Sequence, residues 1–210
     1  MSPFHLLVLA LSGGLGLGIA QAHEEHAAAP AATGPAVQAV AGGGTLDARS
    51  YFTDTELLNQ DGETVRFYSD VLAGRVVLLN VIFTSCEDAC PLITRKLTEV
   101  RKALGEQAGQ VHFISLTSDP ANDSPQALKA YARKHGAEDP NWIFLTGPKE
   151  QMDVVLGRLG QLSRSAEEHS TLLIAGDVAN KRWSKIRPDA PPAAIAQRLQ
   201  LLTLPPAAGR

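Results

Sequence analysis

The sequence contains little cysteine: among its 210 residues only Cys86 and Cys90 carry a thiol, and they lie four positions apart. A framework of several disulfides, as in small secreted domains, is therefore excluded. The chain is long enough to bury a sufficient core without such crosslinks. Two cysteines this close act locally, as a redox pair, a metal clamp or the closure of a small loop.

The sequence also lacks an excess of either charge, since its formal net charge is -3. This balance gives no reason to expect nucleic acid or an anionic membrane surface as a partner. Internal repeats and blocks of like charge are absent, as are a phosphate-cradling glycine loop and a Ser/His/Asp pattern. The candidate chemistry therefore centres on the two thiols.

The first 22 residues are typical of a secretory signal peptide. Residues 6–20 are largely apolar and contain no Asp, Glu, Lys or Arg, and Ala20-Gln21-Ala22 follows as a cleavage signal. The alternative is an uncleaved membrane anchor, but the apolar run is shorter than the roughly 20 residues that span a bilayer. We expect an exported, periplasmic protein, with anchoring to the inner membrane if this segment is retained. A disulfide can persist in that compartment.

The rest of the chain divides into three parts. Residues 23–45 are rich in Ala, Pro and Gly without periodicity, which predicts a flexible linker. Residues 46–204 form the predicted folded domain, and residues 205–210 a tail.

Within that domain, strand and helix patterns alternate. Asp61-Gly62 predicts a hairpin turn, and the nearly unbroken apolar run 76–83 predicts a strand buried on both faces. Further strands are expected at 111–116, 143–145 and 171–175, and helices from 91 to 104 and at 125–135, 148–159 and 192–202. This order predicts an α/β fold with helices on both faces of a central sheet.

Cys86 and Cys90 stand where the strand 76–83 passes into the next helix. Ligands of α/β sheets sit at the carboxyl ends of strands, and backbone N–H groups at a helix start stabilise a thiolate. A spacing of four would place both sulfurs on one face of a helical turn, where they could share an ion or form a disulfide. The alternative is a structural disulfide or two buried core thiols.

Three histidines of the domain are candidates for a further ligand. His112 begins a strand and is expected to be structural. His135 lies in the last turn of a helix, where a cation complements the dipole. His169 lies in a polar stretch just before the strand 171–175, a position where a histidine is by itself more often only solvated.

The segment from Asp119 to Pro125 contains two carboxylates that could be mistaken for an acid/base pair. A turn followed by a helix cap accounts for Asp119, Asp123 and Ser124 without catalysis.

The stretch Phe83-Thr84-Ser85-Cys86-Glu87-Asp88-Ala89-Cys90-Pro91 resembles the F-T-x-C-x-x-x-C-P signature of the Sco/SenC family. Further matches follow the family's order and extend over residues 46–202. They are Asp61-Gly62, the segment Asp119 to Pro125, the stretch Trp142 to Gly147, and Glu168-His169-Ser170. The family usually has Asp where this chain has Glu168.

The resemblance implies a thioredoxin-like fold with a central mixed sheet and an N-terminal hairpin extension. It also implies copper, Cu(I) and with an added ligand Cu(II), bound by Cys86, Cys90 and His169. The implied function is a metallochaperone, not an enzyme, that delivers copper to the dinuclear copper site of a cytochrome c oxidase subunit or of a similar exported cuproprotein.

Two alternatives use the same site. In a thiol–disulfide oxidoreductase, Cys86 and Cys90 would be the redox-active pair that reduces cysteines of a partner protein. In a copper or redox sensor, the site would signal through a partner. A separate hypothesis concerns His23 and His26: after cleavage behind Ala22, the new amino terminus and these imidazoles would chelate Cu(II). The alternative is a solvated linker.

Overall fold

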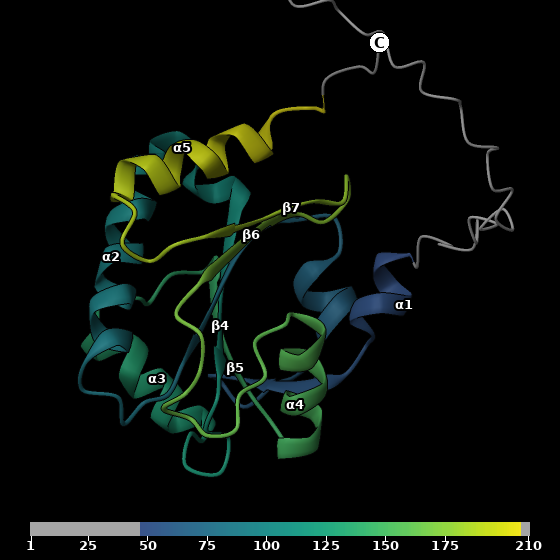
Figure 1. The fold of residues 1–210 in the computed structure, drawn as a ribbon, viewed down its shortest axis with the longest axis vertical. Coiled ribbons are helices and arrows are strands. Elements are labelled where there is room, and N and C mark those ends of the chain that lie inside the picture. The colour runs from purple at the N-terminus through teal and green to yellow at the C-terminus, as the bar shows by residue number, and fades with distance from the viewer. Residues whose placement is uncertain (1–46, 207–210) are drawn as a thin grey trace, which may run out of the picture. The chain divides into compact units, whose positions relative to one another are not determined.

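The computed structural model describes residues 47–206, which form a seven-stranded mixed sheet with helices on both faces (Figure 1). The sheet order is β2-β1-β5-β4-β3-β6-β7. The strands are β1 (Glu56–Asn59), β2 (Thr64–Arg66), β3 (Val76–Ile82), β4 (Val111–Thr117), β5 (Trp142–Thr146), β6 (Leu173–Asp177) and β7 (Arg182–Ile186). The predicted α/β class, mixed sheet and N-terminal hairpin of β1 and β2 are confirmed.

The strand directions decide which loops meet. β3, β4 and β5 run parallel, whereas β6 runs antiparallel to its neighbour β3. The amino end of β6 therefore lies at the same sheet edge as the carboxyl end of β3. Residues just after β3 and just before β6 are brought together there, although they are far apart in the sequence.

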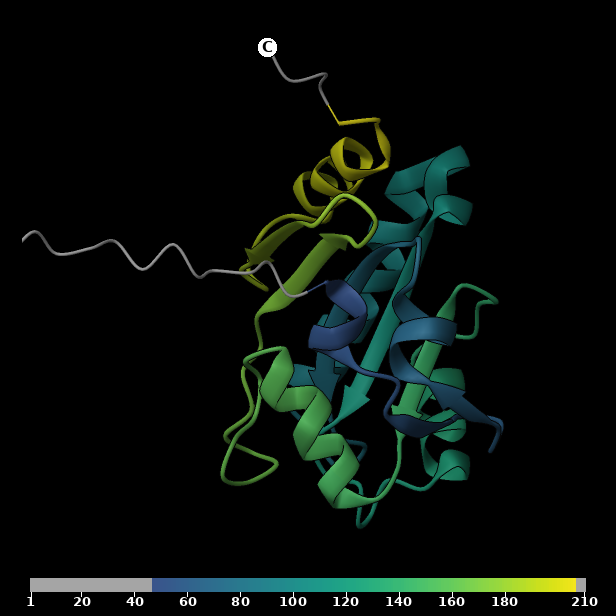
Figure 2. The same cartoon turned by 90° about the vertical axis from the view of Figure 1, so that its right-hand side faces the viewer.

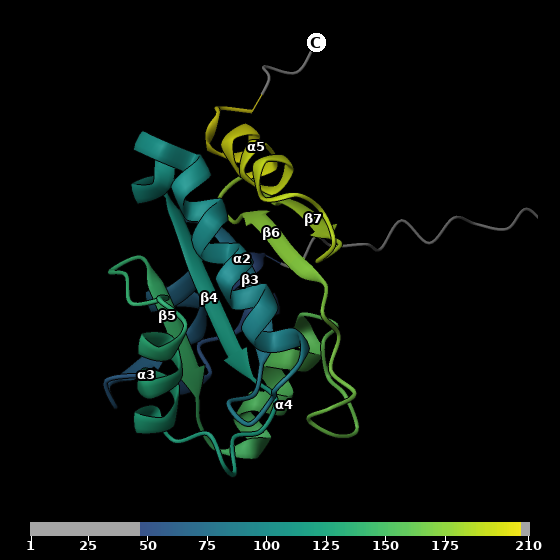
Figure 3. The ribbon, with the colours of Figure 1, turned by 90° about the vertical axis from the view of Figure 1, so that its left-hand side faces the viewer.

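Helices cover the two faces of the sheet unequally (Figures 2 and 3). One face carries α2 (Ala89–Leu104), α3 (Pro125–Lys134) and α5 (Pro192–Thr203), and the other carries α1 (Ala48–Phe52), the π-helix η1 (Phe67–Leu72) and α4 (Lys149–Arg158). A 3-10 turn, η2 (Gly105–Gln110), links α2 to β4.

Strand β3 is buried on both faces because its side chains alternate between two cores. Leu78 and Ile82 pack with the α2 face, whereas Val77, Leu79 and Val81 pack with the α4 face. The predicted, nearly unbroken apolar run thus contributes side chains to both cores.

Asn80 is the polar exception within that run, and a hydrogen-bond chain across three strands accounts for it. The indole N–H of Trp142 donates to Ser115 Oγ at 3.0 Å, and the Ser115 hydroxyl donates to Asn80 Oδ1 at 2.8 Å. The chain gives the Trp142 indole N–H, the Ser115 hydroxyl and Asn80 Oδ1 a buried partner each.

Some expectations need correction. The strand predicted at 171–175 begins at Leu173, and the helix predicted from Pro91 begins at Ala89. His135 was expected in the last turn of a helix, but α3 ends at Lys134 and His135 is its C-cap, where burial lowers the pKa of the imidazole.

Several predictions concern residues outside the described part of the chain. These are the signal peptide 1–22, the linker 23–45 with His23 and His26, and the end of the tail. The domain bounds 46–204 remain a prediction. Within residues 47–206, no helix combines the length and apolar character needed to cross a membrane.

Candidate functional site

Cys86 and Cys90 lie on either side of the start of α2. Cys90 is in the first turn of the helix, whereas Cys86 is in the preceding loop. The expectation of two sulfurs on one helical face is therefore corrected. Instead, the Cys90 backbone N–H donates to Cys86 Sγ at 3.4 Å, so the Cys86 sulfur accepts from one of the otherwise unpaired donors at the helix start. Both cysteines are free thiols.

The two thiols differ in acidity. Burial disfavours the Cys86 thiolate, but hydrogen bonds from the Cys90 thiol and from backbone N–H groups outweigh it and lower the Cys86 pKa. Burial, with the hydrogen bond that Cys90 donates to Cys86, raises the pKa of Cys90 to about 12. Cys86 is thus the half-exposed thiol with the lower pKa, and Cys90 the buried thiol with the higher pKa.

His169 reaches the same place from the amino side of β6. Its Nε2 lies 3.5 Å from Cys90 Sγ. Its Nδ1 lies 3.0 Å from the Ser170 carbonyl oxygen, and since a carbonyl only accepts, Nδ1 carries the proton and donates. The Nε2 lone pair is then directed at the thiol, in the tautomer that a metal ligand requires. The Phe83 ring, edge-on at 5.6 Å, fixes the imidazole plane.

The donor set is suited to copper. Thiolates are soft ligands that select Cu(I), and imidazole also suits copper. Within residues 47–206, however, no three His, Cys, Asp or Glu side chains are gathered tightly enough to hold an ion as they stand. Cys90 and His169 are already in contact, and the half-exposed Cys86 would be the third donor.

An open cavity of about 520 Å³ leads to these side chains. Its lining includes Cys86, His169 and the carboxylate residues Glu87, Asp88 and Glu167. Glu168 lies instead beside Arg164 in the neighbouring hollow. The His169 imidazole instead has the Ser170 backbone carbonyl as its partner, in a contact that does not involve Glu168.

Asp123 is a site residue that the sequence reasoning missed. Its side chain is 1% exposed and accepts hydrogen bonds from the Thr84 backbone N–H at 3.1 Å, the Thr84 hydroxyl at 2.5 Å and the Thr117 hydroxyl at 2.5 Å. The predicted helix cap is made by Ser124 alone, which accepts from the Ala127 N–H. Asp123 thus fastens the loop that carries Cys86 to the start of α3.

Ser118 fastens the other loop. Its hydroxyl lies 3.3 Å from the carbonyl oxygens of Ile82 and Ala166, and the Ala166 carbonyl also accepts from the His169 N–H. The end of β3 and the segment that carries His169 are therefore held by one side chain.

The model of the SCO1/SenC family matches residues 44–202. The chain belongs to the SCO1/SenC family. It is 43% identical over 89 residues to the SCO1 protein homolog of Bacillus subtilis, a stretch that covers 42% of this chain and 45% of the relative. The match thus spans about half the length of that relative.

Solved Sco structures have the same fold. ScoI of Bradyrhizobium japonicum, solved with copper bound, superposes with a TM-score of 0.59 at 25% identity and covers 70% of this chain and 96% of its own. BsSco is described as a Sco-family cytochrome c oxidase assembly protein with a disulfide switch. It superposes with a TM-score of 0.62 at 28% identity and covers 72% of this chain and 92% of its own. The thioredoxin-like fold of the SCO1/SenC family is therefore shared by this chain.

Proposed function

We propose that this chain is a copper metallochaperone, in which Cys86, Cys90 and His169 hold the copper that is its cargo. The observation that carries the proposal is the 3.5 Å approach of His169 Nε2 to Cys90 Sγ, with Nδ1 committed to the Ser170 carbonyl. A redox pair needs no imidazole aimed at its buried thiol, whereas a metal site needs a third donor.

The proposed delivery proceeds by ligand exchange. A thiolate of the acceptor protein replaces Cys86 first, since Cys86 is half-exposed whereas Cys90 is buried. The acceptor we propose is a cytochrome c oxidase subunit with a dinuclear copper site, or a similar exported cuproprotein. This choice is supported by family membership and by the assembly role stated for BsSco.

The test is a Cu(I) competition titration on the reduced protein, comparing wild type, His169→Ala and the control His135→Ala. His135 lies at the end of α3, so its substitution removes an imidazole and leaves the cysteines unchanged. We expect one tightly held copper per chain. For His169→Ala we expect a loss larger than the roughly 10–100-fold that removal of an outer-shell partner costs. Equal affinity in all three proteins would refute the ligand assignment.

A second candidate function, thiol–disulfide oxidoreductase, is favoured by the unequal acidity of the thiols. Cys86 thiolate would attack a partner disulfide and release one partner thiolate. Cys90, on losing its proton, would then attack Cys86 Sγ, release the second thiolate and leave this chain oxidised by two electrons. Partner reduction that persists in His169→Ala while copper binding is lost would favour this role.

We further propose that the protein is exported to the periplasm and that residues 1–22 are its leader. Amino-terminal sequencing of the mature chain tests this directly. A start at His23 would also place a free amine beside His23 and His26, as the Cu(II) hypothesis requires. A mature chain that starts at any other residue would remove the reason for the Cu(II) hypothesis.

A further inference from the structure

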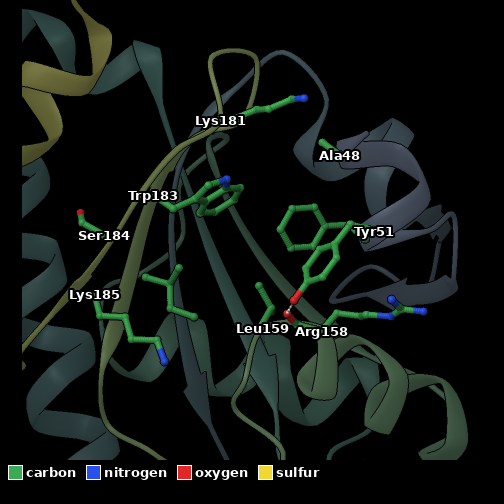
Figure 4. Close-up of a pocket in the computed structure, with 10 residues that line it drawn as sticks. Ala48, Tyr51, Arg158, Leu159, Lys181, Trp183, Ser184 and Lys185 are labelled. Carbon is green, nitrogen blue, oxygen red and sulfur yellow. Dashed lines mark hydrogen bonds between the residues drawn. The ribbon is translucent and has the colours of Figure 1, made fainter. Parts of the chain in front are cut away.

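A second hollow of about 450 Å³ lies on the α4 face of the sheet, between α1, the end of α4 and strands β6 and β7 (Figure 4). It shares no lining residue with the copper cavity. Its apolar lining comes from Phe52, Leu159, Ile174 and Trp183. The hollow is therefore a separate feature that the proposed copper chemistry does not use.

The wall formed by Trp183 is preformed. The ring lies directly over Gly176, where a Cβ would come within 2.2 Å of it, and its centroid is 5.2 Å from that of Phe52. On the opposite side, the Tyr51 hydroxyl donates to the Arg158 carbonyl at 2.8 Å. These side chains are already ordered. Little conformational entropy is therefore lost when a ligand fills the hollow, which favours binding.

Three cations surround the apolar centre: Arg158, Lys181 and Lys185 are all exposed, and Figure 4 shows them on different sides of the hollow. None of the three has a carboxylate within 4.0 Å among the described residues. Their charge is available to an acidic ligand.

The hollow also borders an open sheet edge. In the described part of the chain β7 pairs with β6 alone, so one side of its backbone faces no strand. Trp183 and Lys185, two residues apart on β7, line the hollow, and so does Lys181 in the turn just before the strand. A peptide laid along β7 would present every second side chain to this row.

We propose that this surface binds an extended acidic segment of a partner protein by strand addition to β7. Opposite-charge and apolar pairs are favoured across neighbouring strands. The pattern that fits the row is acidic, any, apolar, any, acidic, with the apolar side chain over Trp183 and the acidic ones facing Lys181 and Lys185. The copper site is not involved.

The test uses the peptide acetyl-Glu-Thr-Leu-Thr-Glu-amide and the full chain, read by tryptophan fluorescence. Trp142 is 2% exposed, so a change in emission reports Trp183. The register control is acetyl-Glu-Leu-Thr-Thr-Glu-amide, which moves Leu to the other face of the strand. We expect the first peptide to bind saturably with a Kd below about 1 mM. The second should bind at least about tenfold more weakly.

Paired variants separate local charge from net charge. Lys181→Glu/Lys185→Glu should weaken binding by at least about tenfold. Lys102→Glu/Lys134→Glu, with the same change of net charge on exposed helix positions, should leave binding unchanged. Circular dichroism and Cu(I) affinity should be unaltered in both.

Three results would overturn the proposal. The first is that the peptide does not bind, or that both double variants lose its affinity to the same extent. The second is binding of phosphatidylglycerol vesicles without peptide binding, which would assign the surface to a membrane. The third is self-association abolished by Lys181→Glu/Lys185→Glu without peptide binding, which would assign it to a second copy of the chain.

Discussion

The Asp123 carboxylate accepts both the backbone N–H and the hydroxyl of Thr84, two residues before Cys86. A buried aspartate on one loop thereby sets the path of the loop that carries the exposed thiol. Thr84 and Asp123 are 39 positions apart in the chain, so the position of Cys86 depends on a contact with a segment that is distant in the sequence.

Asp123→Ala should therefore lower both stability and copper affinity. The substitution leaves buried N–H and O–H donors of Thr84 and Thr117 without an acceptor, at about 1–3 kcal/mol each. We expect a loss of about 3 kcal/mol in urea unfolding and about tenfold or more in Cu(I) affinity. Asp153→Ala removes only an exposed pair with Lys149 and should cost about 0.5 kcal/mol. Similar losses in both variants would contradict the clamp.

The thiol acidities predict the order of alkylation. At pH 7, iodoacetamide should modify Cys86 more than about tenfold faster than Cys90, because the thiolate reacts and the Cys90 pKa is about 12. Peptide mapping by mass spectrometry measures both rates. Cys90→Ala removes a hydrogen bond that lowers the Cys86 pKa and should slow Cys86 at the same pH. Modification of Cys90 first would show that the assignment is reversed.

Gly176→Ala should destabilise the fold, because its Cβ would overlap the Trp183 ring at 2.2 Å. Overpacking of this kind costs about 1–3 kcal/mol, and displacement of the ring should shift tryptophan emission to the red. The matched control is Gly109→Ala, whose Cβ meets nothing within 4 Å. Chemical unfolding measures the stability of both variants. Equal stability of Gly176→Ala and Gly109→Ala would argue against the packing seen at β6 and β7.

Asp177 predicts an acid-sensitive contribution to stability. Burial disfavours its carboxylate, but hydrogen bonds from Asn180 and Arg182 outweigh this and lower its pKa from 3.8. A depressed folded-state pKa gives stability that is complete above the unfolded pKa and is lost as pH falls through the folded one. The stability gap between wild type and Asp177→Asn should thus be full near neutral pH and shrink below about pH 4.

Thermal melts at a series of pH values measure that gap, with Asp189→Asn as the exposed control. The Asp189 side chain is 66% exposed beside Arg187, so this variant should stay close to wild type at every pH. A gap for Asp177→Asn that does not change with pH would exclude linkage to this carboxylate.

Strong local patterns made most of the fold predictable. The run beginning at Val76 identified the interior strand β3, and Ser124-Pro125 identified the start of α3. The strand β7 was missed because Arg182–Ile186 mixes charged and polar residues with one Trp, as befits a half-buried edge strand. The helix α1 was missed because five residues give no periodicity to detect.

The site was predictable only in part, because its members come from three loops. Cys86 and Cys90 carry their own local signal between strand and helix. His169 has no such signal, since the antiparallel placement of β6 brings it to Cys90, and only the family resemblance pointed to it. Asp123 was interpreted as part of a helix cap because its partners Thr84 and Thr117 lie in other segments.

The antiparallel neighbour of β3 has a consequence for how cargo and folding are linked. Cys90 and His169 are separated by 79 positions, so an ion shared between them would close a long chain loop as a reversible crosslink. Only the fold holds the two residues together, and a ligand that binds the folded state alone raises the melting temperature by mass action. Copper loading would then raise the thermal stability of the domain. Transfer of the ion to an acceptor would remove the crosslink and lower that stability again.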